Sequence, residues 1–131
     1  MHPGSKYFKN FFNNKKVLIT GNTGFKGSWM SFILQEMNAK VFGLSIDIPT
    51  KPSNFKCLNL HKTMKTYYGD VSEIKFFNSV IKKVKPDIIF HLAGQSIVFK
   101  SYKDPYETIK TNSEGVLNLL DSLKNKYCKE L

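Results

Sequence analysis

The stretch Lys16-Val-Leu-Ile-Thr-Gly-Asn-Thr-Gly-Phe-Lys-Gly27 decides the fold of this 131-residue chain. Its first five residues form a short apolar run ended by glycine, a pattern typical of a strand buried on both faces of a parallel sheet. Gly21, Gly24 and Gly27 follow at the spacing G-x-x-G-x-x-G, and residues 25–37 then carry apolar side chains at helical spacing. A strand, a glycine turn and a helix in this order predict main-chain N–H groups that approach a diphosphate. The alternative is a glycine turn that binds no ligand.

Outward from this stretch, short apolar runs alternate with helical patterns. Further strands are predicted at 40–46, 66–68 and 87–92, and residues 48–65 predict a loop with a short helix. Helices are predicted from Ser72 and Glu73 to the residues before Pro86, and from Asp104-Pro105 onward, where aspartate is the N-cap. Right-handed crossovers then give an α/β, Rossmann-like, doubly wound parallel sheet in the order 3-2-1-4, with helices on both faces. We expect residues 1–131 to form a single domain.

The amino-terminal residues predict one more helix. Tyr7, Phe8, Phe11 and Phe12 fall at helical spacing, and we expect this aromatic face to pack against the edge of the sheet.

The composition limits the classes of partner. The chain has 20 basic and 10 acidic residues, a net charge of +10, and every basic residue is lysine. Arginine makes most bidentate contacts to guanine edges and phosphates, so its absence argues against nucleic-acid binding in spite of the charge. No apolar run is long enough for a membrane span or a signal peptide. Cys57 and Cys128 match no metal-ligand spacing with the three histidines, and two lone thiols fit a reducing cytoplasm.

Two carboxylates follow predicted strands. Asp47 lies 26 residues after Gly21, where it can accept hydrogen bonds from both ribose hydroxyls of an adenosine, which favours NAD over NADP. The alternative role of Asp47 is to cap the turn before Pro49. Asp70 suits the adenine edge, or it is an ordinary turn or cap residue after Gly69. We interpret His91 as a packed strand residue rather than a base or a metal ligand.

Several strings can be compared with known families: Gly21-x-Thr-Gly-Phe-Lys-Gly-Ser-Trp29, Asp47 followed by Pro49-Thr50, Gly69-Asp70, His91-Leu-Ala-Gly-Gln95, Ser101-Tyr102 and Thr111-Asn112. They closely resemble the N-terminal part of the CDP-glucose 4,6-dehydratase family, within the extended short-chain dehydrogenase/reductases. The resemblance runs from about Phe11 to Asp121. The sequence departs from the family at Gly94, Ser96 and Phe99, where members usually have alanine, proline and a basic residue.

The resemblance implies an NAD-dependent reaction on a nucleotide sugar, CDP-glucose. NAD would take hydride from C4 of the glucose, water would leave from C5 and C6, and the hydride would return at C6. By matching position, Gly21, Thr23, Gly24, Phe25 and Gly27 would hold the pyrophosphate, and Asp47 the ribose. Asp70 and Val71 would contact the adenine, Leu92, Ala93 and Gly94 would line the middle of the cofactor, and Thr111 would approach from the last helix.

The family's catalytic Tyr-x-x-x-Lys pair follows a fifth strand, which this sequence does not contain, and the substrate domain is also absent. Tyr106 and Lys110 have this spacing, but they open the helix after the fourth strand, so no catalytic residue is expected here. We therefore expect weak NAD binding without catalysis. The alternatives are a split enzyme completed by a second chain and a basic interaction module without a cofactor. Because the apolar strand 87–92 would form an edge, we also expect self-association.

Overall fold

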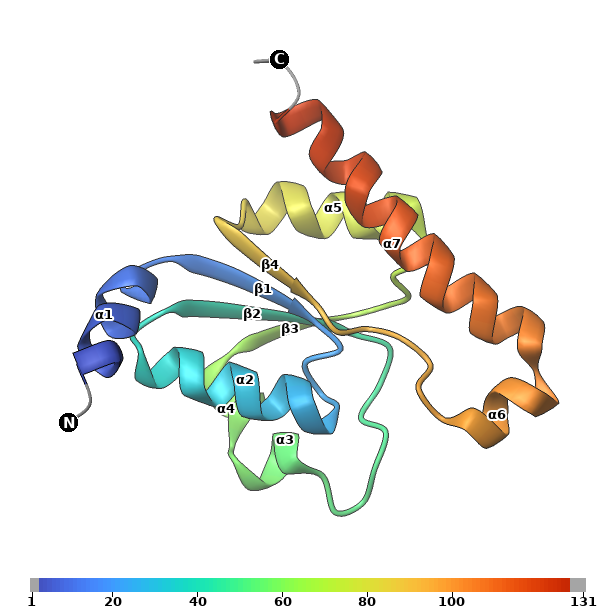
Figure 1. Ribbon diagram of the computed structural model, residues 1–131, viewed down its shortest axis with the longest axis horizontal. Coiled ribbons are helices and arrows are strands. Elements are labelled where there is room, and N and C mark those ends of the chain that lie inside the picture. The colour runs from blue at the N-terminus through green and yellow to red at the C-terminus, as the bar shows by residue number, and fades with distance from the viewer. Residues whose placement is uncertain (1–2, 128–131) are drawn as a thin grey trace.

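Four parallel strands lie at the centre of the protein in the order β3-β2-β1-β4. The computed structural model describes residues 3–127. The strands are β1 (Lys16–Thr20), β2 (Lys40–Ser45), β3 (Lys65–Tyr68) and β4 (Ile88–His91). Val17 of β1 pairs in register with Val41 of β2 on one side and with Ile88 of β4 on the other. The predicted Rossmann-like sheet and its strand order are confirmed (Figure 1).

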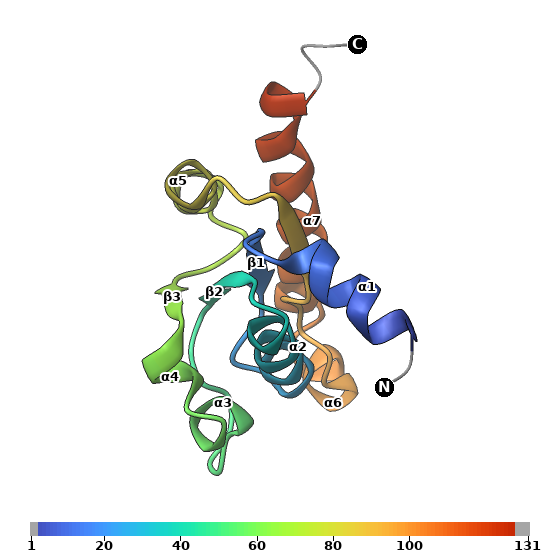
Figure 2. The ribbon, with the colours of Figure 1, turned by 90° about the vertical axis from the view of Figure 1, so that its left-hand side faces the viewer.

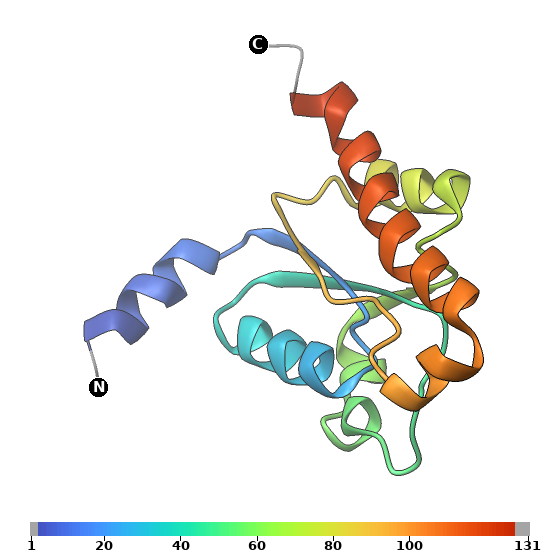
Figure 3. The same ribbon diagram turned by 45° about the vertical axis from the view of Figure 1, so that its right-hand side comes forward.

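Helices cover both faces of this sheet (Figures 2 and 3). One face carries α2 (Phe25–Glu36), α3 (Asn54–Cys57) and α4 (Leu60–Thr63). The other carries α5 (Ile74–Val84) and the long α7 (Pro105–Tyr127), which packs against α5 and against the short α6 (Val98–Lys103). The first helix, α1 (Pro3–Phe12), lies beyond the amino end of β1.

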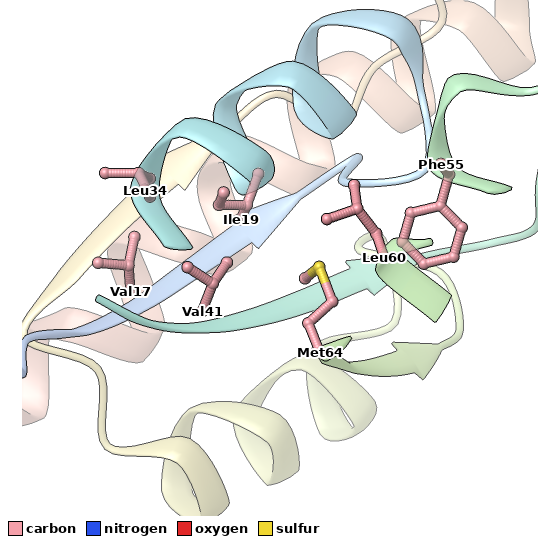
Figure 4. Close-up of a cluster of buried hydrophobic side chains, with 7 residues drawn as sticks. All are labelled: Val17, Ile19, Leu34, Val41, Phe55, Leu60 and Met64. Carbon is pink, nitrogen blue, oxygen red and sulfur yellow. The ribbon is translucent and has the colours of Figure 1, made fainter. Parts of the chain in front are cut away.

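The core is divided by the sheet into two apolar clusters. Val17 and Ile19 face the cluster under α2, which Figure 4 shows, whereas Leu18 faces the cluster under α5. All three side chains are fully buried. Side chains of a strand alternate between the two faces, so a strand with helices on both sides must be apolar at every position. This is why β1 reads as a continuous apolar run.

Most helix boundaries follow from local chemistry. The carboxylate of Asp104 accepts a hydrogen bond from the main-chain N–H of Glu107 at 3.0 Å, which confirms the predicted N-cap of α7. At the end of α2, Asn38 adopts a left-handed φ of 60°, a conformation that asparagine tolerates. The predicted start of α5 at Ser72 was wrong by two residues, because the N–H of Ser72 donates to the Asp70 side chain in a turn before the helix.

One other expectation needs correction. Tyr7, Phe8 and Phe11 of α1 are 70%, 52% and 49% exposed, and only Phe12 packs against the cluster under α2. The aromatic face of α1 is therefore largely uncovered. Residues 98–103, to which the sequence analysis assigned no element, form α6.

Candidate dinucleotide site at the carboxyl edge of the sheet

The predicted site residues gather at the carboxyl ends of the strands. The chain passes from β1 to β2 to β3 in one direction and then returns to place β4 on the other side of β1. In open α/β sheets, ligands bind at such a reversal of strand order, outside the carboxyl ends. The turns after β1 and β4 therefore form the centre of the candidate site.

Gly21 lets these two turns touch. Its φ is +72°, and a Cβ at this position would lie 2.9 Å from the main-chain nitrogen of Ala93 and from the carbonyl oxygen of Leu92. Gly27 is equally constrained, because a Cβ there would overlap the carbonyl oxygen of Gly21 and lie 2.7 Å from the Cα of Asn22. Gly24 differs from both: a Cβ would meet only the Gly21 oxygen, at 3.4 Å. The turn thus needs two of its glycines to fold, and the third leaves space outside it.

The start of α2 offers donors. Within residues 3–127, the main-chain N–H groups of Phe25, Lys26 and Gly27 have no acceptor in the protein, and Gly24 supplies no side-chain cap. The first hydrogen bond of the helix runs from the N–H of Ser28 to the carbonyl of Gly24, at 2.9 Å. Phe25 is 72% exposed, so solvent reaches this end of the helix. Unpaired donors and the positive end of the helix dipole suit a diphosphate.

Thr23 connects the glycine turn to Asp47. Its hydroxyl donates to the main-chain oxygen of Asp47 at 2.6 Å, and its N–H donates to the Ser45 hydroxyl at 3.3 Å. Thr23 is only 4% exposed. Both of its polar groups thus have protein partners, and we interpret Thr23 as a residue that positions Asp47. The Asp47 residue itself is exposed beside the turn.

Sequence reasoning missed a buried asparagine under the turn. Asn22 is fully buried, its amide donates to the Thr66 hydroxyl at 2.9 Å, and its side-chain oxygen accepts from the Ser45 hydroxyl at 2.9 Å. These contacts tie the end of β1 to β2 and β3. Asn22 occupies a variable position of the glycine pattern, so the motif carried no signal. The glycine at position 43, in the middle of a predicted strand, could have indicated that another group approaches closely there. In the structure that group is the Asn22 side chain, which a Cβ at Gly43 would overlap.

The turn after β3 contains both predicted adenine contacts. Asp70 is half-buried, and one of its carboxylate oxygens accepts from the Ser72 N–H at 2.8 Å, as expected for a turn residue. Val71 is 3% exposed and belongs to the cluster under α5, and its carbonyl accepts from the Asn118 amide at 2.9 Å. The structure therefore gives Asp70 a role in shaping this turn, and Val71 a role in holding it against α7.

After β4, the chain leaves the sheet through Leu92, Ala93 and Gly94. The next residue, Gln95, is held by Asn112 of α7, which accepts from its N–H at 2.7 Å and donates to its carbonyl at 3.1 Å. Thr111 is half-buried beside this clamp. Tyr106 is 76% exposed in the first turn of α7.

His91 is half-buried at the end of β4. Its Nδ1 lies 2.8 Å from the Thr20 hydroxyl, and its Nε2 is buried without a hydrogen-bond partner among the described residues. Burial disfavours the charged imidazolium and lowers the pKa of His91 below its ordinary value of 6.5.

This lowered pKa predicts a loss of stability in mild acid. As the pH falls below about 6.5, the unfolded chain binds a proton at His91 before the folded protein does, so the free energy of unfolding decreases until the pH passes the folded pKa. Above that window it is constant with respect to this group. Urea titrations at a series of pH values measure the effect, and His91→Asn should remove this part of the pH dependence. A variant whose pH profile matches that of the wild type would contradict the assignment.

An apolar groove of about 500 Å³ runs along α2, beginning at Phe25 and Lys26 directly after the glycine turn. It is lined mainly by aromatic and aliphatic side chains: Phe12, Phe25, Lys26, Trp29, Met30, Ile33, Leu34, Met37, Phe90 and Leu92. Apart from Lys26, this lining offers no side-chain partners to phosphate oxygens, so the groove and the donors of the turn serve different contacts. Among the described residues, no group of three or more His, Cys, Asp or Glu side chains could hold a metal ion. Residues 3–127 also contain no helix long and apolar enough to cross a membrane.

Comparisons with known proteins agree with this geometry. The family described as GDP-mannose 4,6 dehydratase matches residues 18–130. CDP-glucose 4,6-dehydratase of Salmonella typhimurium is 44% identical over 116 residues, which are 88% of this chain and 32% of that protein. dTDP-D-glucose 4,6-dehydratase of Dictyostelium discoideum is 30% identical over 119 residues, 88% of this chain and 27% of that protein. The chain spans 32% and 27% of the length of these two relatives.

Solved structures share the fold. The UDP-glucose 4-epimerase of Thermus thermophilus, in complex with NAD, superposes with a TM-score of 0.73 at 27% identity and covers 83% of this chain and 33% of its own. The UDP-glucose 4-epimerase of Thermotoga maritima, with UDP-glucose, gives a TM-score of 0.73 at 28% identity over 83% of this chain and 34% of its own.

Proposed function

The chain belongs to the GDP-mannose 4,6 dehydratase family, and from that premise we propose that it is the NAD-binding N-terminal part of a nucleotide-sugar 4,6-dehydratase. The observation that carries the proposal is the set of unpaired N–H groups at residues 25–27, directly after the glycine turn, where Phe25 and Lys26 are exposed. The identity to the Salmonella enzyme supports CDP-glucose as the substrate of the complete enzyme. We propose that residues 1–131 contribute one domain to it.

Different residues of the site bind different parts of the cofactor. The N–H groups of Phe25, Lys26 and Gly27 donate to the pyrophosphate, and the open side of Gly24 admits it. Asp47 accepts from the ribose hydroxyls, Asp70 and Val71 lie at the adenine, and the turn from Leu92 to Gly94, with Thr111, borders the remainder. When bound, NAD supplies an acceptor for hydride from the sugar. The chain's own contribution is to bind and orient it.

Isothermal titration of the folded chain with NAD tests the proposal. We expect weak, saturable binding, because only the adenosine and pyrophosphate half of the cofactor would be held by these residues. Absence of heat at millimolar NAD, from a sample shown by circular dichroism to be folded, would remove the binding claim. A DNA titration at low and high salt serves as a control for binding through lysine charge alone.

Asp47 should discriminate between the two nicotinamide cofactors. Asp47→Asn removes the charge that accepts from the ribose, so we expect the Kd for NAD to rise about tenfold. Binding of NADP should not weaken, since its 2′-phosphate no longer faces a negative charge. Asp121→Asn, an exposed site on α7, changes the net charge equally and is the matched control. Equal effects of the two variants on NAD affinity would show that Asp47 acts only through the net charge.

The catalytic groups would come from another segment of protein. We propose that the C-terminal two thirds of a dehydratase, in the same protein or in a second chain, supply the tyrosine, the lysine and the sugar-binding domain. Co-expression with the unmatched C-terminal part of the Salmonella relative tests this, with formation of a 4-keto sugar as the readout. We also propose a cytoplasmic location, which the exposed free thiol of Cys57 supports.

The isolated 131-residue polypeptide should self-associate. β4 lies at the edge of the described sheet. Phe90 of β4 and Leu92, just after the strand, both line the apolar groove. The open edge of the strand therefore continues into an apolar surface. We propose that a second copy covers both. Light scattering after size-exclusion chromatography should show dimers or larger species that Ile33→Lys reduces. The control Tyr106→Lys changes an exposed residue of α7 that does not line the groove, and it should leave these species unchanged. A wild-type monomer at high concentration would contradict this.

A further inference from the structure

Thr20 and His91 occupy the point where the strand order reverses. They are register partners at the carboxyl ends of β1 and β4, although 71 residues separate them in sequence. Thr20 is fully buried, and the glycine turn and the Leu92-Ala93 turn begin at the residues that follow them. Any change at this pair is therefore transmitted directly to the two turns of the candidate site.

The Thr20 hydroxyl has three neighbours. Its oxygen lies 2.8 Å from Nδ1 of His91 and 3.1 Å from the main-chain nitrogens of both Leu92 and Ala93. The Leu92 N–H is shared with the Thr20 carbonyl oxygen, also at 3.1 Å. The two amides can only donate, so they occupy the two lone pairs of the hydroxyl oxygen. The hydroxyl proton is then left to donate to Nδ1. The opposite arrangement, with a proton on Nδ1, would direct three donors at two lone pairs and leave the hydroxyl proton without an acceptor.

The other edge of the imidazole faces α7. A Cβ at the buried Gly115 would lie 3.4 Å from Nε2 of His91 and 2.9 Å from Cγ2 of Val71, so a glycine allows the helix to approach this closely. In the arrangement above Nε2 carries the proton, and it is buried without a partner among the described residues. The neutral imidazole therefore leaves its Nε2–H without a hydrogen bond while Nδ1 keeps its contact with the Thr20 hydroxyl. We take this as an indication that the contact at Nδ1 has a role.

We propose that His91 is a positioning residue for the cofactor: by accepting the Thr20 hydroxyl proton at Nδ1, it aims the oxygen of Thr20 at the amides of Leu92 and Ala93 and so fixes the turn that borders the bound NAD. The proposal rests on the proposed function for its ligand. The hydrogen-bond arrangement itself does not depend on NAD. Without an acceptor at residue 91, the Thr20 hydroxyl can rotate to donate elsewhere, and the two amides lose a directed acceptor.

Two substitutions separate positioning from packing. In His91→Asn, the side-chain oxygen takes the place of Nδ1 and can still accept, whereas His91→Leu keeps an apolar side chain of similar reach without an acceptor. We expect His91→Leu to raise the Kd for NAD about tenfold, the loss typical of a mispaired buried hydrogen-bonding group, and His91→Asn to restore most of the affinity. Thr20→Val should behave as His91→Leu does, and the double variant should be no weaker than either single variant. Equal Kd values for His91→Asn and His91→Leu would overturn the positioning role.

Nitrogen NMR of the free protein tests the arrangement without any ligand. Long-range proton–nitrogen correlations of the His91 ring should show a protonated Nε2 and an unprotonated Nδ1 at a pH of about 7.5, where the imidazole is neutral. A protonated Nδ1 would overturn the inference even if NAD binds. If the wild type binds no NAD, the proposed function fails, and the same spectra still decide the hydrogen-bond arrangement. The positioning role would also be overturned if Nδ1 is the acceptor but Thr20→Val leaves the backbone chemical shifts of residues 92–94 unchanged.

Discussion

Replacing Gly27 by alanine is expected to destabilise the folded protein severely. The added Cβ would overlap the carbonyl oxygen of Gly21 and approach the Cα of Asn22, and neither main-chain atom can move without displacing β1. The higher helix propensity of alanine returns only about 1 kcal/mol. A main-chain overlap in a buried turn belongs to the severe class of substitutions, so we expect a loss of about 4 kcal/mol or more in the free energy of unfolding. Thermal and urea denaturation measure it.

Gly24→Ala is the matched variant three residues earlier. Its Cβ would meet only the Gly21 oxygen at an ordinary distance, and φ at Gly24 is −72°, which any residue adopts. We expect a stability change of about 1 kcal/mol or less, since alanine is a somewhat poorer N-cap than glycine. The methyl group would project where the diphosphate has to approach, so NAD binding should fall by at least about tenfold, the equivalent of a lost charge-assisted hydrogen bond. If both variants lose stability equally, or neither loses NAD affinity, this division of the glycines is wrong.

Asn22→Ala should destabilise the protein by about 2–4 kcal/mol, because the buried Ser45 hydroxyl and the half-buried Thr66 hydroxyl each lose their hydrogen bond to the Asn22 side chain, and a small cavity opens. The control is Asn10→Ala on the exposed face of α1, where little change is expected.

Gly43 provides a sharper test of this network. In the wild type, Gly43→Ala places its methyl group on the Asn22 side chain and should be strongly destabilising. In the Asn22→Ala background the same methyl group enters the space that the amide has left, so Gly43→Ala should restore part of the stability. Such a reversal of sign in a double-mutant cycle indicates that the two residues contact each other or share the same space. Additive effects in urea denaturation would show that the two residues do not share that space.

The sheet could be predicted from the sequence because its strands are apolar at positions facing both layers. β1 carries this signal at Val17, Leu18 and Ile19, and the glycines after it mark the turn. The prediction that the aromatic face of α1 packs against the sheet was wrong. The helical spacing of Tyr7 and Phe8 indicates a helix, but it does not indicate what covers that helix.

The sequence predicted those site residues whose type has one common role at that place in the motif. Glycine in the turn and aspartate after a strand were assigned from the sequence. Asn22, Ser45 and Thr66 were not, because small polar residues at strand ends are common and their partner is fixed only when three strands come together. The role of His91 depends in the same way on Thr20, whose distance in sequence conceals the contact.

The insertion of β4 beside β1 has a consequence for synthesis on the ribosome. β1 is complete once residue 20 has emerged, but the strand that covers its second edge ends at His91. Until then, a nascent chain carries an apolar ribbon with open main-chain groups along one side, which is the kind of surface that holdase chaperones protect. Translation speed between β3 and β4 therefore sets how long that ribbon stays uncovered.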